Sequence, residues 1–149
     1  MKKGNERRKK RIRSARVEPV SIVDDDPSVR ETTVDLMQSS GFAANAFASA
    51  EDFLASRALD DTACLILDVK MQGMGGVELQ RQLRAKGLHI PIIFITAHND
   101  EGVRAQALKG GAIAFLLKPV NPKELFRAVR SVLNRRNRRH STRTSTTAK

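Results

Sequence analysis

Short apolar segments alternate with longer amphipathic segments through the middle of the chain. Runs rich in β-branched and aliphatic residues predict strands at 19–23, 63–67, 90–95 and 113–117. A weaker run, diluted by alanines, predicts a further strand at 42–47. The segment after each run carries apolar residues at helical spacing, so a strand and a helix alternate five times between residues 18 and 134.

Four of these helices have a start signal, a capping side chain that accepts hydrogen bonds from free backbone N–H groups. The predicted caps are Asp26 before Pro27, Ser49, Asn99 or Asp100, and Asn121 before Pro122. A stripe of Leu125, Val129, Val132 and Leu133 predicts the buried face of the last helix. Alternation of this kind is typical of a parallel sheet with helices on both faces. We therefore expect an α/β protein, a doubly wound five-stranded parallel sheet in (βα)5 order.

Polar side chains stand where the predicted strands end. Asp24 and Asp25 follow the first strand, Asp68 the third, Thr96 the fourth and Lys118 the fifth. A lone aspartate at such a place is typically a helix cap, but groups at the carboxyl ends of parallel strands converge on one crevice. Clustered carboxylates repel unless a cation joins them, and oxygen ligands favour Mg²⁺. With an ammonium and a hydroxyl to bind phosphoryl oxygens, the set predicts a site where a carboxylate accepts a phosphoryl group.

Composition narrows the class of protein. A chain of 149 residues with 40% apolar residues is long enough for one domain with a core. Its single cysteine, Cys64, excludes an internal disulfide framework and a cysteine-based zinc site. The sequence contains neither an apolar run long enough to span a bilayer nor the apolar stretch of a secretory signal. We expect a cytoplasmic protein without a membrane partner.

The net charge of +11 is concentrated at the two ends. Residues 1–17 carry nine Lys and Arg against one acid, and residues 135–149 carry six and no acid, whereas 18–134 is mildly acidic. Such runs are typically disordered, so we expect two basic tails around one domain and no output domain. They permit weak, non-specific contact with nucleic acid, but the chain has no Trp or Tyr for base stacking.

Five segments of 18–134 resemble the receiver domain of bacterial two-component response regulators. The matching segments are VDDDPS at 23–28, LDVKM at 67–71, GVEL at 76–79, FITAH at 94–98 and FLLKP at 115–119. They are spread over the whole domain in the family's order, and their residues are most similar to those of the FixJ-like branch. The resemblance implies a flavodoxin-like receiver fold.

The resemblance also implies roles for the residues at the strand ends. Asp68 is expected to accept the phosphoryl group, and Lys118 to bind it. Asp24, Asp25 and Asp68, with the backbone carbonyl of Lys70, are expected to hold Mg²⁺. The Lys118–Pro119 bond is expected to be cis.

Further positions match residues that the family uses for switching. Thr96 is expected to move toward the phosphoryl group and Phe115 to act as the aromatic switch. Lys70 and His98 are expected to tune hydrolysis of the acyl phosphate. Gln72 stands where the family usually has proline, so we expect a more mobile loop there, which bears on Mg²⁺ affinity and on the rate of phosphorylation.

The partners implied are a sensor histidine kinase as phosphoryl donor and a downstream protein that binds the face of the fourth helix, fifth strand and fifth helix. A phosphorylation-dependent homodimer is a further possibility. On this interpretation the chain is no enzyme beyond its own phosphorylation and dephosphorylation. It acts either as a stand-alone receiver or as the receiver part of a shortened transcription regulator, and the sequence leaves both open.

Overall fold

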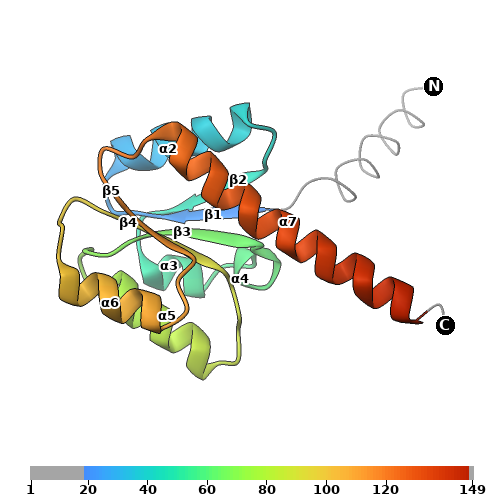
Figure 1. The fold of residues 1–149 in the computed structure, drawn as a ribbon. Helices are drawn as coiled ribbons and strands as arrows, with labels where there is room; N and C mark the ends of the chain where they lie inside the picture. Colours follow the sequence, from blue (N-terminus) through green and yellow to red (C-terminus); the bar gives the residue numbers. More distant parts are fainter. Residues whose placement is uncertain (1–18, 148–149) are drawn as a thin grey trace.

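One five-stranded parallel sheet forms the centre of the protein, in the strand order β2-β1-β3-β4-β5 (Figure 1). The structure is a computed structural model that describes residues 19–147, with side chains described for 19–134. The strands are β1 (Val20–Val23), β2 (Ala44–Phe47), β3 (Cys64–Asp68), β4 (Ile92–Thr96) and β5 (Ala114–Leu117). The predicted α/β fold with five parallel strands is confirmed.

The fourth strand begins two residues later than the sequence predicts and ends one residue later. Pro91 has no backbone N–H and cannot donate to a ladder, so the strand begins after it. Thr96 is the last residue of β4, and its carbonyl accepts a hydrogen bond of 2.7 Å from the N–H of Lys118. This contact brings the ends of β4 and β5 together beside the crevice.

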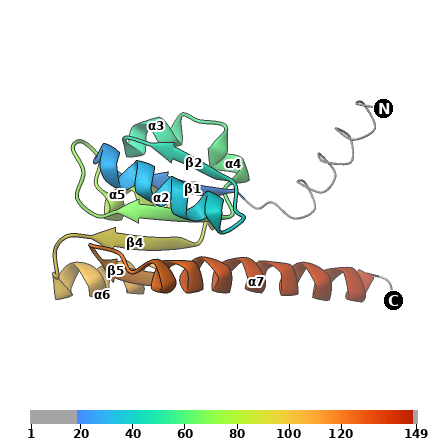
Figure 2. The ribbon, with the colours of Figure 1, turned by 90° about the horizontal axis from the view of Figure 1, so that it is seen from above.

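Helices cover both faces of the sheet (Figures 1 and 2). They are α2 (Pro27–Ser39), α3 (Ala50–Leu54), α4 (Ala58–Asp61), α5 (Gly76–Ala85), α6 (Glu101–Lys109) and α7 (Pro122–Thr147). On one face, Ile22, Ile66 and Ile95 pack with Met37 of α2 and Val129 of α7. The other face packs against α3, α5 and α6, so the residues between the helices form two cores, one on each side of the sheet.

The predicted capping residues accept the hydrogen bonds expected of them. Asp26 accepts from the N–H of Ser28 at 2.9 Å, and Ser49 accepts from Asp52 at 3.0 Å. Of the two alternatives for α6, the cap is Asp100, whose side chain accepts from Val103. The short helix α4 was not predicted, because it has only four residues and no side-chain cap.

Helix α7 begins after Asn121, whose side chain accepts from the N–H of Lys123 at 2.9 Å. Its predicted stripe of Leu125, Val129, Val132 and Leu133 is buried. The helical backbone continues to Thr147, beyond the edge of the sheet (Figure 2). The disordered tail expected over 135–149 stays a prediction. No Gly or Pro follows Pro122 to interrupt the helix.

The predicted N-terminal tail, 1–17, lies outside the described residues. The division of the chain into two tails and one domain stays a prediction. Among the described helices, none combines the length and the apolar character needed to cross a bilayer.

Candidate functional site

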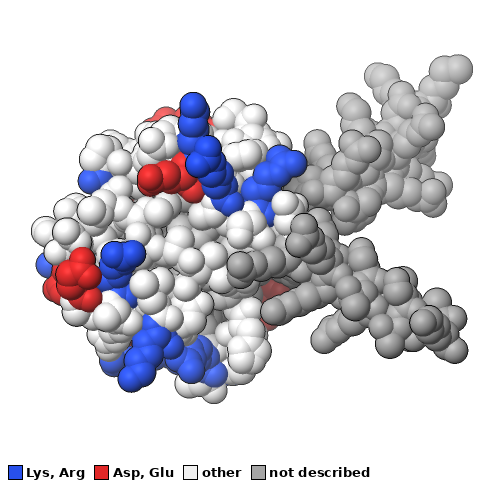
Figure 3. Space-filling view, viewed as in Figure 1, with Lys and Arg blue, Asp and Glu red and all other residues white. Residues whose placement is uncertain are grey.

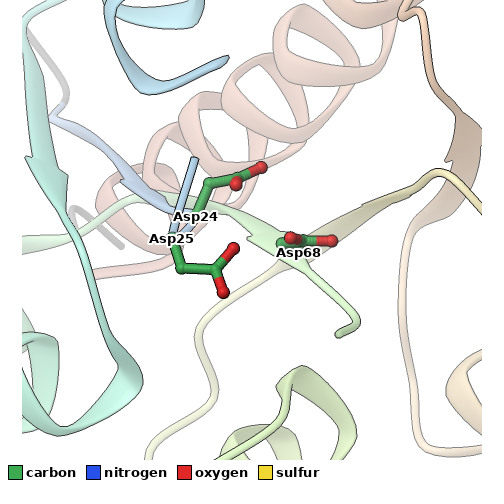
Figure 4. A group of neighbouring side chains, drawn as sticks. All are labelled: Asp24, Asp25 and Asp68. Carbon is green, nitrogen blue, oxygen red and sulfur yellow. The ribbon is translucent and has the colours of Figure 1, made fainter. Parts of the chain in front are cut away.

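Three carboxylates meet at the carboxyl ends of two neighbouring strands (Figure 4). Asp24 and Asp25 directly follow β1, and Asp68 is the last residue of β3, which pairs with β1 in parallel. One carboxylate oxygen from each residue lies within 4.8 Å of the others. The chain leaves β1 toward β2 on one side and leaves β3 toward β4 on the other, so the cluster lies at the switch point of the sheet.

Asp24 is the most buried member of the cluster, with no exposed surface. Its Oδ1 accepts a hydrogen bond from the N–H of Asp26 at 2.9 Å, and its backbone carbonyl accepts one from the Arg30 guanidinium at 2.8 Å. Its Oδ2 has no hydrogen-bond partner of good geometry among the described residues. A buried carboxylate oxygen in this state is costly unless a cation lies beside it.

Lys118 supplies part of that positive charge. Its Nζ lies 2.8 Å from Oδ2 of Asp24 and 3.4 Å from Oδ2 of Asp68. Burial disfavours the charged ammonium, but the contacts with Asp24 and Asp68 outweigh burial and raise the pKa of Lys118. The lysine therefore stays charged and bridges two carboxylates that come from neighbouring strands.

Asp68 is 5% exposed at the mouth of the crevice. Burial, followed by the negative charge of Asp24, raises the pKa of its carboxyl to about 6, although Lys118 opposes the shift. Burial is the larger cause of the raised pKa, and the excess of negative charge adds to it, because three carboxylates share one ammonium. At neutral pH the carboxylate of Asp68 is mostly ionised.

The donor set fits Mg²⁺. All three side chains offer oxygen, the ligand that this ion prefers, and Oδ2 of Asp24 is a buried oxygen with unused lone pairs. A divalent cation here would balance charge that Lys118 leaves uncompensated. The backbone carbonyl of Lys70, two residues after Asp68, stays a predicted ligand.

Thr96 and Phe115 lie on the neighbouring strands β4 and β5, which pair in parallel. Thr96 is 1% exposed and its Oγ1 accepts a hydrogen bond from the N–H of His98 at 3.2 Å. Phe115 is half-buried, with its ring centroid 6.2 Å from that of Phe94 in a tilted arrangement. Their proposed switching roles stay predictions.

The remaining predicted site residues lie at the same edge of the sheet. Lys70 and His98 are exposed in the loops that follow β3 and β4, and their effect on hydrolysis stays a prediction. The Lys118–Pro119 bond is cis, as expected.

Sequence reasoning missed three groups that position the cluster. Arg30 holds the backbone of Asp24, and the backbone N–H of Gln72 donates to Oδ2 of Asp25 at 3.3 Å. Gly76, at the start of α5, lies so close to the carbonyl of Asp68 that a Cβ would overlap it. The glycine-rich segment was the only signal for Gly76, and a backbone donor such as that of Gln72 leaves no signal in side-chain chemistry.

Residues 20–130 match the response regulator receiver domain family. This match covers most of the chain, and the cluster described above lies within it. The chain belongs to the receiver domain family. Receiver domains are phosphorylated by sensor histidine kinases of two-component systems, usually bind Mg²⁺ at an acidic pocket, and are typically not catalytic enzymes.

The curated relatives support the similarity to the FixJ-like branch. Nodulation protein W of Bradyrhizobium diazoefficiens is 44% identical over 126 residues, which are 84% of this chain and 56% of that protein. The transcriptional regulatory protein FixJ of Azorhizobium caulinodans is 40% identical over 117 residues, 78% of this chain and 56% of that protein. The receiver chain thus spans about half the length of the curated relatives it matches.

Solved structures show the same fold. The response regulator StyR superposes with a TM-score of 0.76 at 42% identity, over 88% of this chain and 67% of that one. The structure titled FixJ-N superposes with a TM-score of 0.70 at 36% identity, over 76% of this chain and 91% of that one.

Proposed function

We propose that this receiver accepts a phosphoryl group on Asp68 from the phosphohistidine of a sensor histidine kinase. The observation that carries the proposal is the bridge of Lys118 between Asp24 and Asp68 in a cluster of three carboxylates. A structural ion pair needs one carboxylate, not three. An excess of acid beside one lysine matches a site that receives a cation and a phosphoryl group.

In the transfer, an oxygen of Asp68 forms a bond to phosphorus while the phosphorus–nitrogen bond of the donor breaks. The imidazole leaves with the electron pair of that bond. Lys118, 3.4 Å from Asp68, neutralises charge on the phosphoryl oxygens. Asp24, Asp25 and Asp68, with the carbonyl of Lys70, would hold Mg²⁺, which when bound supplies further positive charge to the phosphoryl oxygens. Hydrolysis of the aspartyl phosphate, tuned by Lys70 and His98, resets the site, so the chain turns over no separate small substrate.

The proposed output is a change in the face made by α6, β5 and α7. Attraction of the Thr96 hydroxyl to the phosphoryl group vacates space beside β5, which Phe115 fills. This face exposes Leu108 by 40% and Leu117 by 46%. Exposed aliphatic side chains of this kind suit a downstream protein or a second phosphorylated copy of the chain.

A specific observation favours an alternative output. The curated relatives are about twice as long as the aligned segment, and FixJ is named a transcriptional regulatory protein. The chain therefore acts either as a stand-alone receiver or as the receiver part of a transcription regulator. Non-specific contact between its basic end segments and nucleic acid is compatible with both. In either form we propose a cytoplasmic location, where response regulators generally act.

The test uses phosphoramidate, whose phosphorus–nitrogen bond resembles that of phosphohistidine. With Mg²⁺, intact-mass measurement should show one phosphoryl group per chain, labile to hydroxylamine as an acyl phosphate is. The Asp68→Asn variant should show none, while Asp60→Asn, an exposed aspartate of α4, should react as the wild type does. An adduct that persists in Asp68→Asn would refute the assignment.

A further inference from the structure

Two hollows lie side by side between helices α5 and α6, with volumes of about 360 and about 300 Å³. They share the four residues Gln80, Arg84, Lys109 and Gly110. We refer to the pair as the α5–α6 groove. It lies at the amino ends of β4 and β5, because Ile92 and Ile113 line it, whereas Asp68 stands at the carboxyl end of β3.

The groove is lined by cations and by no carboxylate. Arg81, Arg84 and Lys109 line it from two different helices. Arg84 is held in place by a hydrogen bond of 3.3 Å to the carbonyl of Gly110, and Arg81 lies 3.8 Å from Glu78, which is outside both hollows. Within the part of the chain whose side chains are described, Lys109 forms no ion pair. Figure 3 shows Lys and Arg gathered where α5 and α6 lie in Figure 1.

The larger hollow adds an apolar floor, whereas Val77 is the one large apolar side chain that lines the smaller hollow. Leu83, Leu88, Ile90 and Pro91 line it, together with Ile113, which is 36% exposed. A site with an apolar compartment next to a cationic one fits an occupant that carries aliphatic and acidic groups close together.

The junction of the two hollows is firmly built. Gln80 is 4% exposed and its side-chain amide donates to the carbonyl of Ala107 at 3.0 Å, which ties α5 to α6. A Cβ at Gly110 would lie 2.8 Å from Oε1 of Gln80, so the close approach of the two helices requires glycine there. The groove is therefore a preformed feature of the fold, which lowers the entropy cost of binding.

We propose that the α5–α6 groove binds an acidic, amphipathic peptide segment of a partner protein. Positive charge without a carboxylate selects an acidic partner, and the apolar floor selects one with aliphatic side chains. Nucleic acid fits less well, because neither hollow is lined by Phe, Tyr or Trp for a base to stack on, and His89 is the single imidazole among the lining residues. The groove and Asp68 lie at opposite ends of the sheet, so an occupant of the groove does not contact the phosphoryl site. The proposal goes beyond the phosphoryl switch and assigns the receiver a second docking site.

The test titrates the ¹⁵N-labelled full chain with a peptide in which pairs of Leu and Glu alternate. Saturable shifts are expected in the amide signals of Gly110, Gly111 and Ile113. The double variant Arg84→Glu/Lys109→Glu should bind about tenfold more weakly, as reversal of two contact charges predicts. The matched control Arg57→Glu/Lys123→Glu has the same net charge, changes exposed cations outside the groove, and should bind as the wild type does. Ile113→Ser should also weaken binding, and a peptide with Lys in place of Glu should give no shifts.

Several outcomes would overturn the proposal. One is an absence of shifts in the wild type, and another is equal binding by both double variants, which would assign the peptide to the basic end segments. Shifts caused by a short DNA duplex but not by the peptide would make the groove a nucleic-acid surface. Since Asp68→Asn should bind the peptide normally, failure of the phosphoryl assignment leaves this test intact.

Discussion

The ammonium of Lys118 lies 2.8 Å from Oδ2 of Asp24, a carboxylate oxygen with no other polar partner of good geometry among the described residues. The two residues come from the loops after β5 and β1, which are separated in the sheet by β3 and β4. The same Nζ lies 3.4 Å from Oδ2 of Asp68. Asp68, the proposed phosphoryl acceptor, therefore lies beside both members of the ion pair.

Removal of Lys118 should destabilise the protein, because the carboxylates of the cluster then repel one another without a neutralising charge. We expect Lys118→Ala to lower the free energy of unfolding of the metal-free protein by about 1–3 kcal/mol, below the range for a fully buried pair because the lysine side chain is partly exposed. Mg²⁺ should restore part of the loss, since it neutralises the same carboxylates. Urea unfolding in EDTA and in Mg²⁺ measures both effects, with Lys123→Ala as the exposed control. Equal stability of Lys118→Ala and the wild type in EDTA would contradict the electrostatic account.

The raised pKa of Asp68 predicts a pH dependence of stability. Its carboxyl titrates near 3.8 when unperturbed and at about 6 in the folded chain, so between these values the folded state binds more protons. The contribution of Asp68 to stability is full below the lower value and is lost as pH rises through the upper one. In EDTA, the free energy of unfolding of Asp68→Asn relative to wild type should therefore rise between about pH 4 and about pH 6 and then level off.

Urea unfolding across this range measures the difference. The control Asp60→Asn should show no such rise, and a falling difference would refute the sign.

The side chains of the site could be predicted from the sequence because each stands at the end of a strand. Asp24, Asp68 and Thr96 end or follow apolar runs that are buried on both faces, and Lys118 follows the apolar but partly exposed run of β5. Apolar runs of this kind are easy to recognise. The contacts of the site that could not be predicted are made by backbone groups. The N–H of Gln72 and the carbonyl of Asp68 carry no sequence signal, since every residue has them. The short helix α4 was missed for the related reason that a single turn has no periodicity.

The hydrogen bond from Gln72 changes the expectation for proline at that position. Proline would stiffen the loop, which by itself stabilises by about 0.4–1 kcal/mol, but it would remove the N–H that donates to Asp25 at 3.3 Å. Because that bond is worth about 1 kcal/mol, we expect Gln72→Pro to change stability by no more than about 0.5 kcal/mol. Freed from its donor, Asp25 should bind Mg²⁺ about threefold more tightly, consistent with loss of part of one hydrogen bond.

Calorimetric titration with Mg²⁺ measures the affinity of the Gln72 variants. Gln72→Ala keeps the backbone N–H and should bind Mg²⁺ as the wild type does. Equal gains in the alanine and proline variants would assign the effect to the glutamine side chain and contradict the role of the N–H.

Gly76 provides the test of how closely the site depends on backbone packing. A Cβ at this position would overlap the carbonyl oxygen of Asp68 and lie 3.1 Å from the ring of Phe94, and neither can move without shifting a buried strand. We expect Gly76→Ala to lower the free energy of unfolding by about 1–3 kcal/mol, the usual cost of overpacking. Displacement of Asp68 should also slow phosphorylation by phosphoramidate, followed by intact mass in the temperature range where the variant stays folded. Gly102→Ala is the matched control, because its Cβ would meet only the side chain of Asp100, whose Oδ1 lies 3.3 Å away and caps α6. This contact offsets the gain in helix propensity, so the change should alter stability by less than about 1 kcal/mol and leave the rate unchanged. Normal phosphorylation by Gly76→Ala would show that Asp68 tolerates movement of its strand end, and that the contact serves packing alone.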